Sequence, residues 1–167
     1  MTTAEKAVQE LRPMVDAYLL ARVHAEVLRE KVDAICRQVL AEAPLKVSAK
    51  NAERGMPELI TEPNRAWLAD LDSPEMQDYD AECDKRLRAA GLKPESMPAD
   101  HCPALVAERI KVEAEWLLLE TAWQAIGQSG DGWKGLYGDN RKKFLDLCVG
   151  LVVNSPGYQN PLTGKAA

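Results

Sequence analysis

The stretch PALVAERIKVEAEWLLLETAWQAI, residues 103–126, decides the fold expected for this chain. Its larger apolar side chains recur at steps of seven, four, three, four and three, which is the spacing of one face of an α-helix. They are Leu105, Val112, Trp116, Leu119, Trp123 and Ile126. A proline stands first, where its missing N–H costs nothing. The pattern predicts a long helix over 103–126.

The first forty residues show the same helical spacing of apolar side chains. Pro13 interrupts the pattern, so we expect a short N-terminal turn or helix and then a long helix over 13–43, which Pro44 ends. Such a helix would be roughly 45 Å long at ~1.5 Å per residue, too long to be buried by anything but another long helix. The two long helices therefore predict an antiparallel pair at the centre of the fold.

A shorter helix is expected over 73–90, because its ends carry clear signals. Ser73 is a good N-cap residue, Pro74 suits the first turn, and Gly91 suits the left-handed conformation that follows a helix. The buried stripe would include Cys83 and Leu87. The connector over 92–103 contains prolines and is expected to lack regular structure.

The last helix is expected over 139–153, with Asp139 as its N-cap. Its inward-facing side chains would be Phe144, Leu147, Cys148, Leu151 and Val152. Residues 44–60 contain Pro and Gly and are expected to form a loop. A short helix near 63–70 would begin at Thr61 and Pro63.

These elements predict an all-α fold, a single-domain antiparallel helical bundle with two long helices and shorter packing helices. We expect one domain over residues 1–167, because a chain of this length is typical of a protein with a single hydrophobic core. The residues expected in the core are Leu28, Val32, Ile35, Cys83, Leu87, Trp116, Trp123 and Phe144.

The composition restricts the classes of partner. A net charge of −5 argues against non-specific binding to nucleic acid or to membrane surfaces, since both need a basic surface. The sequence shows neither a secretory signal nor an apolar run of membrane-spanning length. The cysteines lie far apart, without a Cys-x-x-Cys motif, and are expected to be reduced and mostly buried. They are Cys36, Cys83, Cys102 and Cys148. We therefore expect a cytoplasmic protein.

The segment GDGWKG at 130–135 has the G-x-G-x-x-G spacing of dinucleotide-binding loops. That motif needs a strand before its first glycine and a helix opening at its last, so that backbone N–H groups meet the phosphates. Here a long helix precedes the loop, and Leu-Tyr-Gly follows Gly135. We therefore expect no nucleotide cofactor, and no pattern of metal-ligand spacing occurs elsewhere.

The same loop offers two aromatic side chains as contact residues. Trp133 and Tyr137 stand among glycines, and bulky aromatics of this kind act as anchors in protein interfaces. The alternative for Trp133 is that it folds back over the end of the preceding helix and covers Trp123 or Ile126, since large aromatics are usually mostly buried.

The segment 70–84 holds seven carboxylates and no base. Two like-charge pairs at i, i+4 cost helix stability: Asp78 with Glu82, and Asp80 with Asp84. We take these four residues as candidates for contact with a basic partner. The alternative is a solvated face without a partner.

Two other function classes remain open. Carboxylates on two facing helices are typical of all-α Mg²⁺-dependent nucleotide hydrolases; here they would be Glu26, Glu30 and Asp33 with Glu113 and Glu120. The arginines interspersed with the first row favour a solvated, salt-bridged face instead. A nucleic-acid-associated role would rest on Arg141, Lys142 and Lys143.

The phrases CPALVAE (102–108) and GLVVNSPGY (150–158) resemble segments of small phage and prophage proteins. This resemblance implies an origin and carries no catalytic residue. The sequence favours a non-catalytic interaction or assembly protein, without cofactor or metal. It would bind a protein partner or a second copy of itself, with the acidic helix and the loop of Trp133 and Tyr137 as contact surfaces.

Overall fold

The structure is a computed structural model that describes residues 1–64, 67–68, 74–92 and 103–163. Of these residues, 73% are helical and 3% lie in strands. Two helices are long, α1 (Thr3–Glu42) and α5 (Pro103–Ala125). The all-α fold predicted from the sequence is thereby confirmed, as is the span of the second long helix.

Contacts divide the chain into two compact units. One consists of Met1–Glu26 and Ala107–Ala167, and the other of Val27–Val106. A single domain over the whole chain stays a prediction.

Helix α1 begins at Thr3, well before the predicted start at Pro13. Its first turn is closed by a capping box in which Thr2 and Glu5 bind each other's backbone. The Glu5 N–H donates to Thr2 Oγ1 at 3.2 Å, and the Thr2 N–H donates to Glu5 Oε2 at 2.6 Å. Pro13 lies inside the helix, where it removes a backbone hydrogen bond. Because Leu11 and Val15 on either side are buried in the core, packing outweighs that loss.

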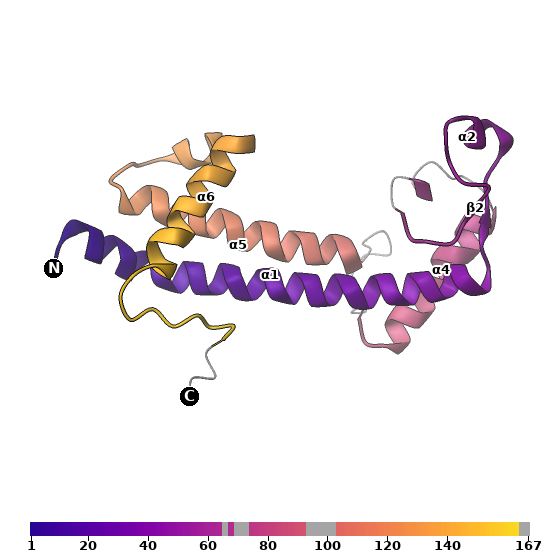
Figure 1. Ribbon diagram of the computed structural model, residues 1–167, viewed down its shortest axis with the longest axis horizontal. Helices are drawn as coiled ribbons and strands as arrows, with labels where there is room; N and C mark the ends of the chain where they lie inside the picture. The colour runs from indigo at the N-terminus through magenta and orange to yellow at the C-terminus, as the bar shows by residue number, and fades with distance from the viewer. Residues whose placement is uncertain (65–66, 69–73, 93–102, 164–167) are drawn as a thin grey trace. The chain divides into compact units, whose positions relative to one another are not determined.

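The first unit packs the N-terminal part of α1 against α5 and α6 (Gly138–Val153). Within it α5 runs antiparallel to α1, and α6 crosses them (Figure 1). A short 3-10 helix, η1 (Asp131–Gly135), precedes α6. The buried core residues of this unit are Leu11, Val15, Tyr18, Leu118, Leu119, Ala122, Leu145, Cys148 and Val152.

The rotation of α5 about its axis differs from the predicted one. Leu105 and Ile126, expected to face inward, are exposed, whereas small residues such as Ala107 and Ala122 are buried. Trp116 and Trp123 are only half-buried and contact Trp133 of η1 and Phe144 of α6, respectively. Helix α5 is therefore covered on two faces. One covered face carries Trp116 and Trp123 of the predicted stripe, and the other carries the buried alanines.

Helix α6 has the predicted span but a different phase and cap. Leu147 and Leu151, expected inside, are exposed, and the missed Leu145 is buried. Tyr137 occupies the N-cap without a side-chain hydrogen bond, whereas Asp139 lies in the first turn of the helix. An acid there favours the helix dipole, so Asp139 still stabilises this end without capping it.

The second unit contains short elements that the sequence analysis missed. Residues 44–60, predicted to be a loop, contain β1 (Leu45–Lys46), α2 (Ala49–Glu53) and β2 (Leu59–Ile60). The strands pair antiparallel, with Leu45 opposite Ile60, and Ser48 caps α2 by accepting from the Asn51 N–H. Strands of two residues are too short for a period of two to appear in the sequence.

Helix α4 (Pro74–Ala89) completes this unit, and its predicted C-terminal cap is confirmed. Gly91 has a φ of +70°, its N–H donates to the Arg88 carbonyl, and the Leu92 N–H donates to the Leu87 carbonyl. Leu87 is buried with Val32 and Ala104. The core prediction is thus confirmed for Val32, Cys83 and Leu87, which are buried, whereas Leu28, Ile35, Trp116, Trp123 and Phe144 are half-buried.

Several predicted features lie outside the described residues: Ser73 as N-cap, most of the connector over 92–103 with Cys102, and much of the helix near 63–70. In that last segment Trp67 and Leu68 are helical. The Trp67 N–H donates to Asn64 Oδ1 at 3.3 Å, so the side chain that caps this turn is that of Asn64. As for membranes, none of the helices in the described ranges combines the length and apolar character needed to cross a bilayer.

Candidate functional site

The glycine-rich loop holds Trp133 against the core. The Trp133 ring meets the Trp116 ring edge-on, with centroids 5.4 Å apart and planes at 61°. Lys134 Nζ lies over the same indole, 5.5 Å from the ring centroid. Trp133 therefore folds back as the alternative interpretation had it, but onto Trp116 instead of Trp123 or Ile126.

One glycine of this loop, Gly132, is needed for close packing against Trp123. A Cβ atom at this position would lie 2.8 Å from Cζ2 of Trp123, which is closer than non-bonded carbon atoms approach one another. The backbone of η1 thus rests directly on this indole, whose Nε1 is buried without a hydrogen-bond partner. The loop follows helix α5, so the strand that precedes the first glycine of a dinucleotide-binding loop is not found here.

A buried ion pair that the sequence analysis missed lies next to this loop. Arg141 Nε donates to Glu115 Oε1 at 2.7 Å, and the Glu115 side chain is only 9% exposed. The Arg141 guanidinium also lies 5.1 Å from the Trp116 ring centroid. The burial of Glu115 could have been predicted, because it shares the face of α5 that carries Ala107, Leu118 and Ala122, but nothing in the sequence indicates its partner. Of the proposed nucleic-acid contacts, only Lys142 and Lys143 stay exposed.

The four acidic candidates on α4 separate into two exposed and two ion-paired residues. Asp78 and Asp80 are exposed. Glu82 accepts from Arg86 at 2.9 Å, and Asp84 accepts from Arg88 at 3.0 Å. These i, i+4 ion pairs offset the like-charge cost that the sequence predicted. Asp70 and Asp72 lie outside the described residues.

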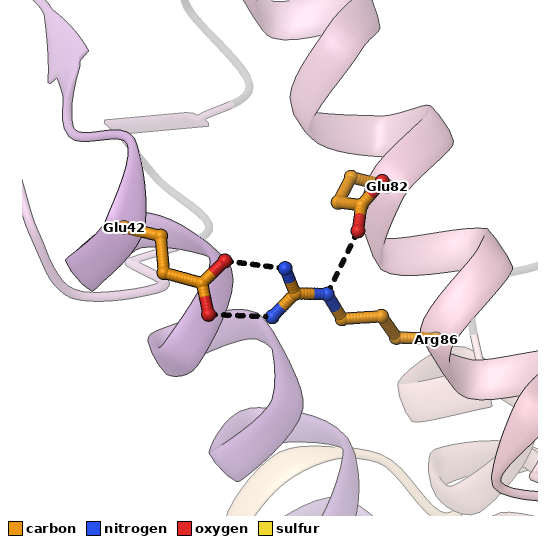
Figure 2. Close-up of polar contacts among 3 residues, drawn as sticks. All are labelled: Glu42, Glu82 and Arg86. Carbon is orange, nitrogen blue, oxygen red and sulfur yellow. Dashed lines mark hydrogen bonds and ion pairs between the residues drawn. The ribbon is translucent and has the colours of Figure 1, made fainter.

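Arg86 also joins α4 to the end of α1. Figure 2 shows its guanidinium between Glu82 and Glu42, with two nitrogens turned to the two Glu42 oxygens. The Nη1–Oε1 distance is 3.1 Å. This bidentate hydrogen bonding lowers the pKa of the Glu42 carboxyl and raises the pKa of Arg86. The Glu42–Arg86 pair therefore fixes α4 against α1 within the second unit.

The carboxylate rows of the hydrolase hypothesis do not form a compact group. Among the residues that the structure describes, no three His, Cys, Asp or Glu side chains are grouped so that they could hold a metal ion. Glu113 pairs with Arg109 at 3.5 Å, and Arg37, which is interspersed with the first row, pairs with Glu62 at 2.8 Å. Glu26 and Glu30 are exposed. Hydrolysis stays a prediction of the sequence.

A hydrogen bond ties the segment after α6 to α1. The Tyr158 hydroxyl donates to Asp16 Oδ1 at 2.6 Å, and Arg12 lies 5.4 Å from the centre of the Tyr158 ring. Burial and then the hydrogen bond to Asp16 raise the pKa of Tyr158 to about 12. No sequence pattern connects residues so far apart in the chain, so this contact could not be predicted.

The surface of α6 turned away from the core carries exposed apolar side chains. Leu147 is 65% exposed and Leu151, one turn later, 42%. Lys143 lies one turn before Leu147 and is also exposed. Tyr137, the other candidate of the loop, is 69% exposed at the N-cap of the same helix. We call Lys143, Leu147 and Leu151 the outer face of α6.

Comparisons with protein-family models, with curated protein sequences and with solved structures find no match to this chain. Its function therefore has to be inferred from its own side chains. The surface features of the described residues from which we argue are the outer face of α6, Tyr137, and the exposed pair Asp78 and Asp80.

Proposed function

We propose that this chain is a non-catalytic assembly protein that acts by binding protein through the outer face of α6, and that its first partner is a second copy of itself. The observation that carries the proposal is the exposure of Leu147 and Leu151, one turn apart, on a helix whose opposite face supplies Leu145, Cys148 and Val152 to the core. Exposed as they are, the two leucines add little to the chain's own core. Fully burying a leucine against a partner would contribute about 1.5–3 kcal/mol.

The outer face of α6 is self-complementary. If two copies pair these helices antiparallel about a two-fold axis, Leu147 of each copy lies opposite Leu151 of the other. Lys143 then lies opposite the end of the second helix near Ser155, so no like charges oppose each other. Because one patch serves both copies, this closed pairing needs no second binding surface.

A second candidate surface is the exposed pair Asp78 and Asp80. Glu82 and Asp84 are engaged by arginines of their own helix, so Asp78 and Asp80 are the two of the four candidate carboxylates that are exposed to a basic partner. An oligolysine peptide tests it. Binding should weaken when both residues are changed to Asn and should stay unchanged in Asp131→Asn, whose carboxylate pairs with Lys134. Equal weakening by both changes would mean that only net charge matters.

A cytoplasmic location and an origin among small phage proteins belong to the same proposal. The location is supported by the absence of a disulfide at Cys36, Cys83 and Cys148, which suits a reducing compartment. The origin is supported by the phrases at 102–108 and 150–158 alone.

Sedimentation equilibrium tests self-association. The wild-type chain should reach twice its 18.4 kDa as concentration rises, and Leu147→Gln should shift the curve toward the monomer because the polar side chain cannot be buried without a partner. Leu117→Gln is the matched control, since Leu117 is 48% exposed on α5. A wild-type monomer at all concentrations would defeat the proposal, and so would equal effects of both variants.

A further inference from the structure

Two cysteines that are distant in the sequence meet inside the second unit. Cys36 on α1 packs against the apolar cluster that contains Cys83 and Tyr79 of α4. Hydrogen bonding between the two thiols is the largest cause that raises the pKa of Cys83, and both thiols, after burial, raise the pKa of Tyr79. Cys83 and Tyr79 are buried, whereas Cys36 is half-buried. Neither cysteine is in a disulfide, and both pack with the end of α1 and the small sheet in this apolar cluster.

We propose that Cys36 and Cys83 are a redox modification site, at which the two thiols form a reversible intramolecular disulfide that links α1 to α4. Sulfur atoms close enough to share a hydrogen bond need only a modest side-chain approach to form a bond. Among the cysteines that the structure describes, Cys36 and Cys83 are the two in this unit, because Cys148 is buried in the core of the first unit.

The surroundings of the two thiols assign them different roles. Cys36 is the more exposed, so it meets a dissolved oxidant first. Its sulfur can accept hydrogen bonds from the Cys83 thiol and the Tyr79 hydroxyl, and both would stabilise a thiolate. The hydrogen bond to Cys36 and burial raise the pKa of Cys83, which therefore keeps its proton until the second step. Tyr79 is a positioning residue in this scheme.

With hydrogen peroxide as oxidant, the reaction balances in two steps. The Cys36 thiolate attacks one peroxide oxygen, an S–O bond forms, the O–O bond breaks, and the departing hydroxide takes a proton to become water. The Cys83 sulfur then loses its proton and attacks the Cys36 sulfur, so that the S–S bond forms, the S–O bond breaks and a second water leaves. Two thiols are oxidised and one peroxide is reduced to two waters.

The disulfide would close the part of the chain that holds β1, α2 and β2, since all three lie between Cys36 and Cys83. A cross-link over a long loop stabilises the folded state, chiefly by restricting the unfolded chain. Oxidation should therefore raise the melting temperature, by about 10 °C for a chain of this size. It should also protect residues 43–64 from proteolysis.

Peroxide treatment of the folded full-length chain, followed by non-reducing peptide mapping, tests the site. The expected product is a peptide pair joining Cys36 to Cys83, lighter by two hydrogen atoms and separated again by dithiothreitol. Cys36→Ala and Cys83→Ala should each abolish it, whereas Cys148→Ala should leave it intact. Circular dichroism checks the fold of each variant; if Cys83→Ala unfolds, the half-buried Cys36→Ala carries the test alone.

Tyr79→Phe tests whether the Tyr79 hydroxyl assists disulfide formation, beyond the closeness of the two thiols. Without the phenol hydroxyl the disulfide should form several-fold more slowly at a given pH, because a donor to the thiolate is lost. An unchanged or faster rate would overturn the role assigned to Tyr79. A cross-link that forms only in urea, or pairing of Cys36 or Cys83 with Cys102 or Cys148 instead, would overturn the site itself, as would the absence of any cross-link.

Discussion

Arg141 Nε donates to Glu115 Oε1 at 2.7 Å, and this arginine is the ion-pair partner of a carboxylate that is only 9% exposed. Arg141→Met should destabilise the fold by about 2–4 kcal/mol, because it leaves a buried charge unpaired. Adding Glu115→Leu should recover much of that loss, since both charges are then gone. Urea unfolding measures the stability of the single and the double variant. Lys142→Met, at the exposed neighbouring position, is the control and should change stability by about 0.5 kcal/mol or less.

Gly132→Ala should destabilise the first unit, because the new Cβ would lie 2.8 Å from Cζ2 of Trp123. That ring packs edge-on against Phe144 and has little room to retreat. We expect a cost of about 1–3 kcal/mol, as for other overpacked sites. Gly135→Ala is the matched control in the same 3-10 helix, since its Cβ would meet nothing within 4 Å. Equal unfolding midpoints in urea for the two variants would contradict the close contact.

The Glu42–Arg86 pair should make the second unit sensitive to acid. The pKa of Glu42 is lower in the folded chain than in the unfolded one, chiefly because Arg86 hydrogen-bonds to the carboxylate. A lowered pKa contributes stability that is present above the unfolded value of about 4.3. That stability is lost as the pH falls through the folded value.

Urea unfolding between pH 7 and pH 3 measures this contribution. Glu42→Gln should be less stable than wild type at pH 7, and the difference should shrink toward pH 3. Glu113→Gln, which removes an exposed pair with Arg109, should show a smaller difference at pH 7. A Glu42→Gln difference that stays constant with pH would show that the ion pair contributes nothing through its charge.

The Tyr158–Asp16 hydrogen bond should appear as a loss of stability at high pH. The pKa of Tyr158 is raised to about 12, so the stabilisation is complete below the unfolded value of about 10 and is lost as the pH rises through 12. Tyr158→Phe should cost about 1–2 kcal/mol at pH 7 and remove this alkaline dependence. Absorbance titration of the wild-type tyrosines provides the check: no group titrating near 12 would contradict the contact.

The spans of α5 and α6 and the C-terminal ends of α1 and α4 could be predicted because their signals are local. The repeat over 103–126, the breaks at Pro44 and Gly91, and the spacing in 139–153 all lie within a few turns of the backbone they control. The start of α1 could have been predicted as well, since Thr2 and Glu5 have the residue types and spacing of a capping box. The prediction was wrong there because Pro13 was taken to begin the helix.

The contacts that depend on three dimensions could not be predicted. Leu105 and Ile126 were placed in the apolar stripe of this helix because they extend a row of large side chains, yet they are exposed. Helix α5 is covered on two faces and uses alanines on one of them. Leu147 was expected to face inward for the same reason. Its exposure, which now supports the proposed function, was therefore not predicted. The pairs Glu115–Arg141 and Glu42–Arg86 join residues from separate helices, and no spacing in the sequence indicates them.

The proposed pairing of α6 with α6 of a second copy is tested most directly by cross-linking at its two leucines. Chains carrying Leu147→Cys are mixed with chains carrying Leu151→Cys, exposed to a mild oxidant, and mapped by non-reducing peptide analysis. We expect an intermolecular disulfide between position 147 of one chain and position 151 of the other, formed faster than with Leu117→Cys in place of either partner. No link between these positions, or links to position 117 at the same rate, would contradict it.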